Sequence, residues 1–187
     1  MNINDKNSSG DFALLYAVSN KKDRMVSFLL DRGADINIKN KDGDTSLMCA
    51  NSYNFESMVT LLLDRGADIN IKNNNGDSVL MRAVRHNKES TVSLLLDRGA
   101  DINIKDNSGN FALMYAVRNN KEIMVSLIID RGADINFKNK DGWTALMNAA
   151  RFDKTNMVSL LLDRGADINI TNNVRIVFGL LLLLLLF

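Results

Sequence analysis

The segment DRGADIN, residues 31–37, decides the fold of this chain because the sequence repeats it at a fixed interval. Further copies of the same seven letters start 33 residues apart, at Asp64, Asp97, Asp130 and Asp163. A constant period of this length indicates a repeat array, in which each repeat buries its apolar face against its neighbours. The 187 residues are therefore better counted as repeats than as one ordinary domain.

Aligning the sequence at this period gives five repeats and a tail. The repeats cover roughly residues 7–39, 40–72, 73–105, 106–138 and 139–171. The N-terminal MNIN aligns with the ADIN segments, so the predicted array spans residues 1–171. Residues 172–187 abandon the pattern and end in an apolar run, and we interpret them as a divergent tail.

Two short helices and a linking segment are predicted in each repeat. GDTSLMCANS, residues 43–52, predicts a turn followed by a helix that Thr45 caps. NFESMVTLLLDRG, residues 54–66, predicts a second helix that Asn54 caps and that Gly66 ends in the left-handed conformation. ADINIKNKDG, residues 34–43, alternates apolar and polar positions before a glycine turn, which favours a projecting β-hairpin-like finger.

Equivalent positions of the repeats predict one continuous apolar core. Three columns hold Leu14, Leu47, Leu80, Leu113 and Leu146; Ala17, Ala50, Ala83, Ala116 and Ala149; and Val26, Val59, Val92, Val125 and Val158. Eight of the nine methionines occupy two further columns, Met48, Met81, Met114 and Met147 in the first helix and Met25, Met58, Met124 and Met157 in the second. A methionine stripe can line an adaptable groove, but beside leucines at this spacing it favours core packing. Because neither helix is long enough to be stable alone, stacking of the repeats must stabilise both.

The 33-residue period, the Gly-x-Thr-x-Leu helix start, the LLL of the second helix and the GADIN segment resemble the ankyrin repeat over residues 1 to about 171. The resemblance implies an all-α repeat solenoid of ankyrin-type helix-turn-helix units with projecting β-hairpin-like fingers. It also implies that fingers and first helices line a concave surface, which members of this family generally use to bind proteins.

The sequence departs from the family pattern where the first helix begins. The proline and histidine of the usual Thr-Pro-Leu-His box are missing, which leaves TSLM at Thr45, SVLM at Ser78 and TALM at Thr144. Methionine donates no hydrogen bond, so we expect these turns to depend more on packing than on side-chain bonds. Phe12 and Phe111 replace the capping threonine, and Asp11 and Asn110 are the predicted substitute caps.

The composition offers little for catalysis. Lys and Arg total 23 against 22 Asp and Glu, so no nucleic-acid partner is expected. The single histidine, His86, and the single cysteine, Cys49, stand in a regular scaffold without a metal-ligand spacing or a phosphate-binding glycine loop. The DRGAD carboxylates recur beside an arginine in every repeat, as in a structural ladder. We therefore predict no enzyme activity, no metal and no cofactor.

Two other polar columns are also interpreted as parts of the scaffold or its surface. Asn37 and its copies are expected to bond within their own fingers. A row of lysines, Lys39, Lys72, Lys105 and Lys138, is interpreted as solubilising surface, with a site for an acidic partner as the alternative.

Partner specificity is expected at exposed positions that differ between repeats, because the constant columns build the fold. After the turn glycine, these positions hold Asp11, Asp44, Asp77, Asn110 and Trp143. On the first helix and at its end, they hold Tyr16, Arg82, Tyr115, Arg85, Arg118 and Arg151, followed by Tyr53, His86 and Phe152. Trp143 is the strongest anchor candidate, since Trp, Tyr and Arg dominate protein interfaces. The alternatives are that Trp143 folds over its own turn, that Tyr16 and Tyr115 pack partly in the core, and that each arginine is solvated surface.

The tail and the cellular location have competing interpretations. One cysteine and an N-terminus without a secretory signal favour the cytoplasm. A helix over residues 176–187 would span ~18 Å of a ~30 Å bilayer core, so a cap over the last repeat is favoured over a membrane anchor or a frameshift remnant. We expect a monomer, unless the tail self-associates, that binds an unidentified protein. The alternative is a tail-anchored, membrane-associated protein or one delivered into a host cell.

Overall fold

The computed structural model describes residues 2–7 and 12–172, which contain ten helices and no strand. First helices of seven residues alternate with second helices of nine. They are α1 (Ala13–Ser19), α2 (Asp23–Asp31), α3 (Ser46–Ser52), α4 (Glu56–Asp64), α5 (Val79–Arg85), α6 (Glu89–Asp97), α7 (Ala112–Arg118), α8 (Glu122–Asp130), α9 (Ala145–Arg151) and α10 (Thr155–Asp163). The predicted all-helical repeat architecture is confirmed.

The chain divides into two compact units. Of the described residues, the N-terminal unit holds 2–7, 12–83 and 90–100, and the C-terminal unit holds 84–89 and 101–172. The boundary falls in the third repeat, so α5 and α6 contribute residues to both units.

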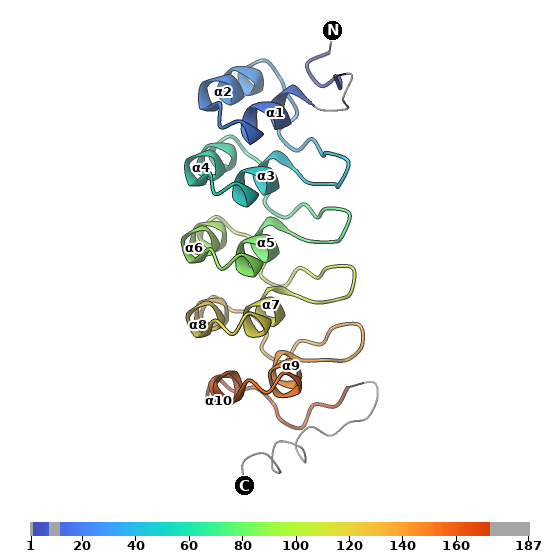
Figure 1. Ribbon diagram of the computed structural model, residues 1–187, viewed down its shortest axis with the longest axis vertical. Coiled ribbons are helices and arrows are strands. Elements are labelled where there is room, and N and C mark those ends of the chain that lie inside the picture. Colours follow the sequence, from blue (N-terminus) through green and yellow to red (C-terminus); the bar gives the residue numbers. More distant parts are fainter. Residues whose placement is uncertain (1, 8–11, 173–187) are drawn as a thin grey trace. The chain divides into compact units, whose positions relative to one another are not determined.

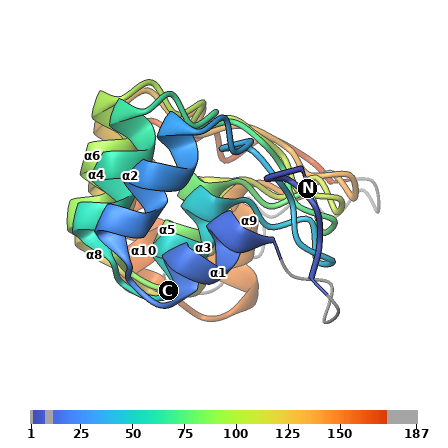
Figure 2. The same cartoon turned by 90° about the horizontal axis from the view of Figure 1, so that it is seen from above.

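Within each unit, neighbouring helix pairs lie side by side in chain order (Figure 1). In the N-terminal unit α1 contacts α2 and α3, and α3 contacts α4; in the C-terminal unit α7 contacts α8 and α9, and α9 contacts α10. Figure 2 shows that the first helices of a unit lie between its second helices and its fingers. The first helices and fingers of each unit therefore share one face.

The buried residues match the columns that predict the core. The five leucines of the Leu47 column are 3% exposed or less, and the alanine and valine columns are buried as well. Seven of the eight columnar methionines are buried, but Met25 is 50% exposed. The prediction for Met25 was wrong because Met58, at the same position of the next repeat in the N-terminal unit, follows the helix pair α1–α2, whereas no described helix precedes α1 and α2.

Hydroxyl side chains cap the first helices of the second, third and fifth repeats. Thr45 Oγ1 accepts a hydrogen bond from the backbone N–H of Met48 at 3.4 Å, and Thr144 caps α9 in the same way. Ser78 Oγ accepts from the backbone N–H of Met81 at 3.3 Å. Each cap satisfies one N–H that the first turn of a helix leaves unpaired.

The substitute cap predicted for α7 and the cap predicted for α4 are wrong. Asn110 does not cap α7, because its side chain bonds to finger residues instead. The helix follows Phe111, whose buried ring lies 5.1 Å from the Phe137 ring, centroid to centroid. Asn54 does not cap α4, since its φ of 62° places it in a left-handed turn before the helix. Asp11, the substitute predicted for α1, lies outside the described residues.

The fingers form turns and isolated bridges instead of hairpin strands in the described residues. Asn40 Oδ1 accepts hydrogen bonds from the backbone N–H groups of Asp42 and Asp44, both at 2.9 Å. Asn37 Oδ1 accepts from the backbone N–H of Asp68 in the next finger at 2.9 Å, so the prediction that it bonds within its own finger was wrong. The asparagine side chain is long enough to reach the backbone of the next finger. In the C-terminal unit, Asn103 and Asn136 accept the same bond from Asp134 and Asp167.

Charged side chains also join neighbouring repeats. The Arg65 guanidinium lies 3.1 Å from the Asp31 carboxylate of the preceding repeat, and Arg98 lies 2.7 Å from Asp64. The C-terminal unit repeats this ion pair between α10 and α8. These side chains are largely exposed, so each pair contributes only about 0–1 kcal/mol to stability. The predicted ladder is present, and it lies between repeats.

The lysine row connects fingers. Lys39 Nζ donates to the backbone oxygen of Lys72, and Lys138 Nζ donates to that of Thr171, both at 3.0 Å. Lys105 Nζ lies 3.9 Å from the centroid of the Phe137 ring. This surface row therefore has structural contacts in addition to its solubilising charge.

The hypotheses about the tail fall on residues 173–187, outside the described part of the chain. Within the described part, no helix has the length and apolar character that crossing a bilayer requires.

Replacing two glycines of the second repeat should separate backbone strain from repeat contact. Gly43 and Gly66 both have a positive φ, so alanine at either should cost about 1 kcal/mol of unfolding free energy. At Gly43 a Cβ would also stand 2.6 Å from the backbone nitrogen of Asn74 in the next finger, whereas at Gly66 it would meet nothing within 4 Å. Gly43→Ala should therefore destabilise the chain more than Gly66→Ala in denaturant unfolding. Equal losses would contradict this account of finger packing.

Candidate partner-binding surface

Thirteen of the fourteen residues predicted to bind a partner lie in the described part of the chain, and Asp11 lies outside it. The N-terminal unit contains Tyr16, Asp44, Tyr53, Asp77 and Arg82. The C-terminal unit contains Arg85, His86, Asn110, Tyr115, Arg118, Trp143, Arg151 and Phe152. The two sets differ in how far their side chains are already engaged.

In the N-terminal unit, two charged residues of the set, Asp44 and Arg82, neutralise each other. Arg82 forms an ion pair with Asp44 and donates to Ser52 Oγ at 2.8 Å. Asn73 Nδ2 donates to the same Asp44 carboxylate at 2.9 Å. The Arg82 and Asp44 side chains are only 20% and 13% exposed, so this pair links two repeats and presents little charge to a partner.

The remaining members of the N-terminal set differ in exposure. Asp77 is 3% exposed and therefore not positioned to contact a partner. Tyr16 and Tyr53 are more than half exposed, and the Tyr53 ring stacks on Phe55 with centroids 5.6 Å apart. The N-terminal unit thus offers exposed aromatic rings without a free charge among these residues.

In the C-terminal unit, Tyr115 belongs to a buried polar cluster. Its hydroxyl donates to the Asp106 carboxylate, and its ring lies 4.1 Å, centroid to guanidinium carbon, from Arg85. Arg85 Nη2 lies 3.9 Å from Asp106 Oδ2. Burial, and then the hydrogen bond to Asp106, raise the pKa of Tyr115 above its ordinary value. Tyr115 is only 9% exposed, which fits the alternative interpretation of partial core packing.

Asp106 is the residue of this cluster that the sequence reasoning missed. The equivalent finger position holds Asn40, Asn73 and Asn139 in other repeats. Asp106 keeps the turn bonds of these asparagines, because its Oδ1 accepts from the backbone N–H of Asn110 at 2.9 Å. The carboxylate adds a charge that attracts Arg85. The sequence feature that could have identified this cluster is the single aspartate in a column of asparagines that was assigned to the scaffold.

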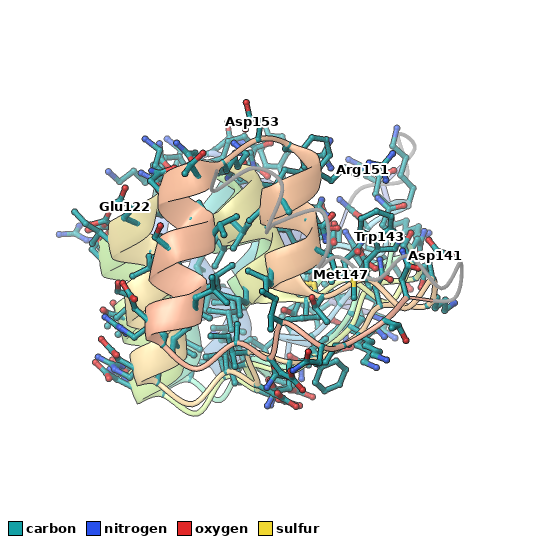
Figure 3. All side chains as sticks on the ribbon, turned by 90° about the horizontal axis from the view of Figure 1, so that it is seen from below. Glu122, Asp141, Trp143, Met147, Arg151 and Asp153 are labelled. Atoms are coloured by element: carbon teal, nitrogen blue, oxygen red, sulfur yellow. The ribbon has the colours of Figure 1, made fainter. Side chains whose placement is uncertain are left out.

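Trp143, which precedes α9, forms an aromatic–arginine cluster with Arg151 and Phe152 at the C-terminal end of that helix. The Arg151 guanidinium carbon lies 5.0 Å from the Trp143 ring centroid (Figure 3). It lies 5.7 Å from the Phe152 ring centroid. The Trp143 backbone N–H donates to Asn139 Oδ1 at 2.9 Å, which fixes the Trp143 backbone in the finger turn. Trp143 is half-buried, while Arg151 and Phe152 are exposed. The sequence predicted all three residues, and the structure brings them together.

A small hollow lies between α7 and α9 in the same unit. Its volume is about 100 Å³, and it is lined by Asn110, Met114, Tyr115, Arg118, Asn148 and Phe152. We call it the Arg118 hollow. The Arg118 side chain is exposed and makes no hydrogen bond or ion pair with any residue in the described part of the chain. It therefore offers a positive charge beside the aromatic–arginine cluster.

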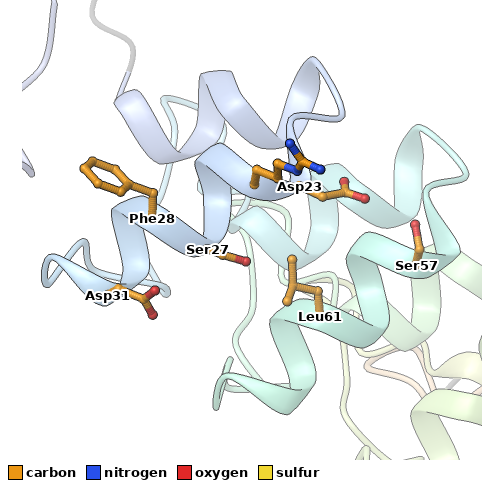
Figure 4. A pocket seen from close by; sticks show the side chains of 7 residues that line it. Asp23, Ser27, Phe28, Asp31, Ser57 and Leu61 are labelled. Carbon is orange, nitrogen blue, oxygen red and sulfur yellow. The ribbon is translucent and has the colours of Figure 1, made fainter.

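A second hollow, which the sequence did not predict, lies on the second-helix side of the N-terminal unit (Figure 4). It measures about 470 Å³ and is lined by Asp23, Arg24, Ser27, Phe28, Asp31, Ser57 and Leu61 on α2 and α4. Phe28 is 50% exposed, but Arg32 already lies 4.6 Å from its ring centroid. Phe28 stands in a column that holds leucine in the next repeat. This difference between repeats is the sequence feature that could have pointed to the hollow.

The single cysteine and the single histidine of the chain lie in different surroundings. Burial, and then the charge of Asp44, raise the pKa of the Cys49 thiol to about 11, so the thiol is protonated at neutral pH. His86 is exposed at the turn after α5. Among the described residues, no three His, Cys, Asp or Glu side chains come together in a way that could hold a metal ion.

Removing one hydroxyl should show that Tyr115 has a structural role. Tyr115→Phe deletes the donor to the Asp106 carboxylate and should cost about 2 kcal/mol of unfolding free energy. Tyr16→Phe is the matched control, because the same AL-x-YAV phrase surrounds a ring that is 63% exposed. We expect the control to change stability by about 0.5 kcal/mol or less in denaturant unfolding. Equal changes would contradict the cluster.

Alkylation of Cys49 should be slow. A pKa near 11, against an ordinary 9.0, leaves about 100-fold less thiolate at pH 8. The rate of reaction with iodoacetamide should therefore be lower by a similar factor than in guanidinium-unfolded chain, and should still be rising with pH above 9. A folded-state rate equal to the unfolded rate would contradict the burial.

Two family models match the sequence. One describes ankyrin repeats in three copies and matches residues 1–73 and 80–172; the other describes ankyrin repeats in many copies and matches residues 53–96. A search of curated proteins finds no match. Ankyrin repeats are generally non-enzymatic modules for protein–protein interaction. Because the matched residues cover most of the sequence and the helix pairs stack as predicted, the chain belongs to the ankyrin repeat family.

Proposed function

We propose that this chain is a non-enzymatic module that binds a partner protein on the surface formed by the first helices and fingers, the side that is concave in ankyrin arrays. The observation that carries the proposal is the aromatic–arginine cluster beside the Arg118 hollow. Trp and Arg are the residues on which binding energy most often concentrates in protein interfaces. We place the main contacts in the C-terminal unit.

The arrangement of the cluster supports this choice. Trp143 is half-buried and its ring lies against Arg151, so part of its side-chain freedom is already lost before binding. The Arg151 guanidinium carbon lies 5.0 Å and 5.7 Å from the two ring centroids, so it places a positive charge beside the two aromatic side chains. In the N-terminal unit, by contrast, the Asp44–Arg82 pair has already neutralised its charges.

The cellular setting belongs to the same proposal. A reducing cytoplasm suits a chain with one cysteine and a protonated, half-buried thiol. We therefore expect the partner to be a cytoplasmic protein that binds the C-terminal unit.

Truncating Trp143 should abolish capture of specific partners. The chain and its Trp143→Ala variant would serve as baits in lysate, with bound proteins quantified by mass spectrometry. We expect at least ~10-fold less recovery of each specific partner with Trp143→Ala, because loss of a central anchor costs about 2 kcal/mol or more. Phe28→Ala, which removes an exposed ring on the second-helix side, is the control and should keep these partners. Equal recovery by all three baits would count against this surface.

A further inference from the structure

We propose that Arg118 and its hollow bind the carboxylate of a single Asp or Glu side chain that stands next to an apolar residue in the partner protein. This inference rests on the proposed function and names the chemistry of the partner. It comes from comparing three arginines that occupy one column at the ends of the first helices, namely Arg85, Arg118 and Arg151.

Two of the three arginines are engaged within the chain. Arg85 lies against the buried Asp106 carboxylate and the Tyr115 ring. Arg151 lies over Trp143 and Phe152. The Arg118 side chain is exposed and has no ion pair or hydrogen bond with the residues that the structure describes. The same column holds Ser19 and Ser52 in the N-terminal unit, so this available charge belongs to the C-terminal unit.

The Arg118 hollow provides polar groups that suit a carboxylate. The planar guanidinium can donate two parallel hydrogen bonds to its two oxygens. Asn110 and Asn148 also line the hollow, and each amide nitrogen carries two hydrogens, of which one is used in bonds to Asp106 and Thr144 respectively. A volume of about 100 Å³ admits a few water-sized groups, which fits a carboxylate and its methylene.

The walls of the hollow also select an apolar neighbour. Met114 and Phe152 line it, and Phe152 is 50% exposed. An aliphatic or aromatic side chain next to the acidic residue would cover this ring and exclude water from the ion pair, which strengthens it.

The charges around the hollow favour one carboxylate over a phosphate or a run of acidic residues. A phosphate dianion is usually held by several cations, and Arg118 is the one cationic side chain among the residues that line this hollow. Exposed Asp141 and Asp153 stand two residues before Trp143 and two residues after Arg151, so they would repel a longer acidic segment. The partner segment therefore carries one acidic side chain flanked by apolar ones.

Selection from a random peptide library displayed on phage, with the full chain as bait, tests the inference. We expect the selected peptides to share one Asp or Glu beside an aromatic or aliphatic residue. A selected peptide, labelled with fluorescein, should bind at least 10-fold more weakly to Arg118→Gln, and more weakly to Arg118→Lys, which keeps the charge without the planar fork. Arg24→Gln, at an exposed arginine beside the other hollow, should bind as the wild type does. Circular dichroism would confirm that each variant is folded.

A double-mutant cycle makes the assignment specific. Replacing the peptide's Asp or Glu by Asn or Gln should weaken binding to the wild type at least 10-fold and leave binding to Arg118→Gln nearly unchanged. The inference would be overturned if the selected peptides shared no acidic residue or required a phosphate. It would also be overturned if the change in the peptide and the Arg118→Gln change affected binding independently. If such peptides still lost affinity with Trp143→Ala, the proposed function would stand without it. Peptides indifferent to both Arg118 and Trp143, or no selected peptide at all, would overturn both.

Discussion

The structure depends on an apolar interior that neighbouring helix pairs share. Helices of seven and nine residues lie below the length at which a helix is stable alone in water, so each pair is stabilised by burying its face against the next. Met58 is fully buried where a preceding pair exists, while Met25, at the same position of the first pair, is half exposed. The same residue is therefore core or surface according to its neighbours, and most of each repeat is committed to stacking.

Polar side chains fix the distance and orientation of successive fingers, which the apolar core alone does not specify. Asn37 accepts a bond from the backbone of the next finger, and Lys39 donates to a backbone oxygen there. These bonds replace the strand pairing that a hairpin would supply, since the described fingers contain only turns and isolated bridges. Because the constant polar residues are used in this way, only unlike residues remain for recognising a partner.

The sequence predicts the features that recur in every repeat, but it does not predict those that depend on one particular neighbouring side chain. The Leu47 column and the Thr45 cap follow from the period, because every repeat faces the same packing problem. The left-handed conformation of Asn54 and the hydrogen bond between Asn37 and the next finger were missed. A column of aligned residues identifies a residue type, but it does not give the backbone conformation or the repeat in which the side chain finds its partner. The residues of the aromatic–arginine cluster were predicted, but their mutual contact and the hollow beside them require coordinates.

The duplicated phrases show why a partner site of this kind escapes pattern analysis. Tyr16 and Tyr115 stand in the same phrase, yet one is exposed and the other is buried against Asp106. Two neighbours of Tyr115 account for the difference: the Asp106 carboxylate, which replaces an amide in the finger and attracts both the tyrosine hydroxyl and Arg85, and Arg85 itself, which comes from the preceding repeat and lies over the ring. The arginines of that column share their position in the repeat and differ in the side chain beside them. One substitution in a finger can therefore decide whether an arginine stabilises the array or stays available to a partner, while the buried core is unchanged.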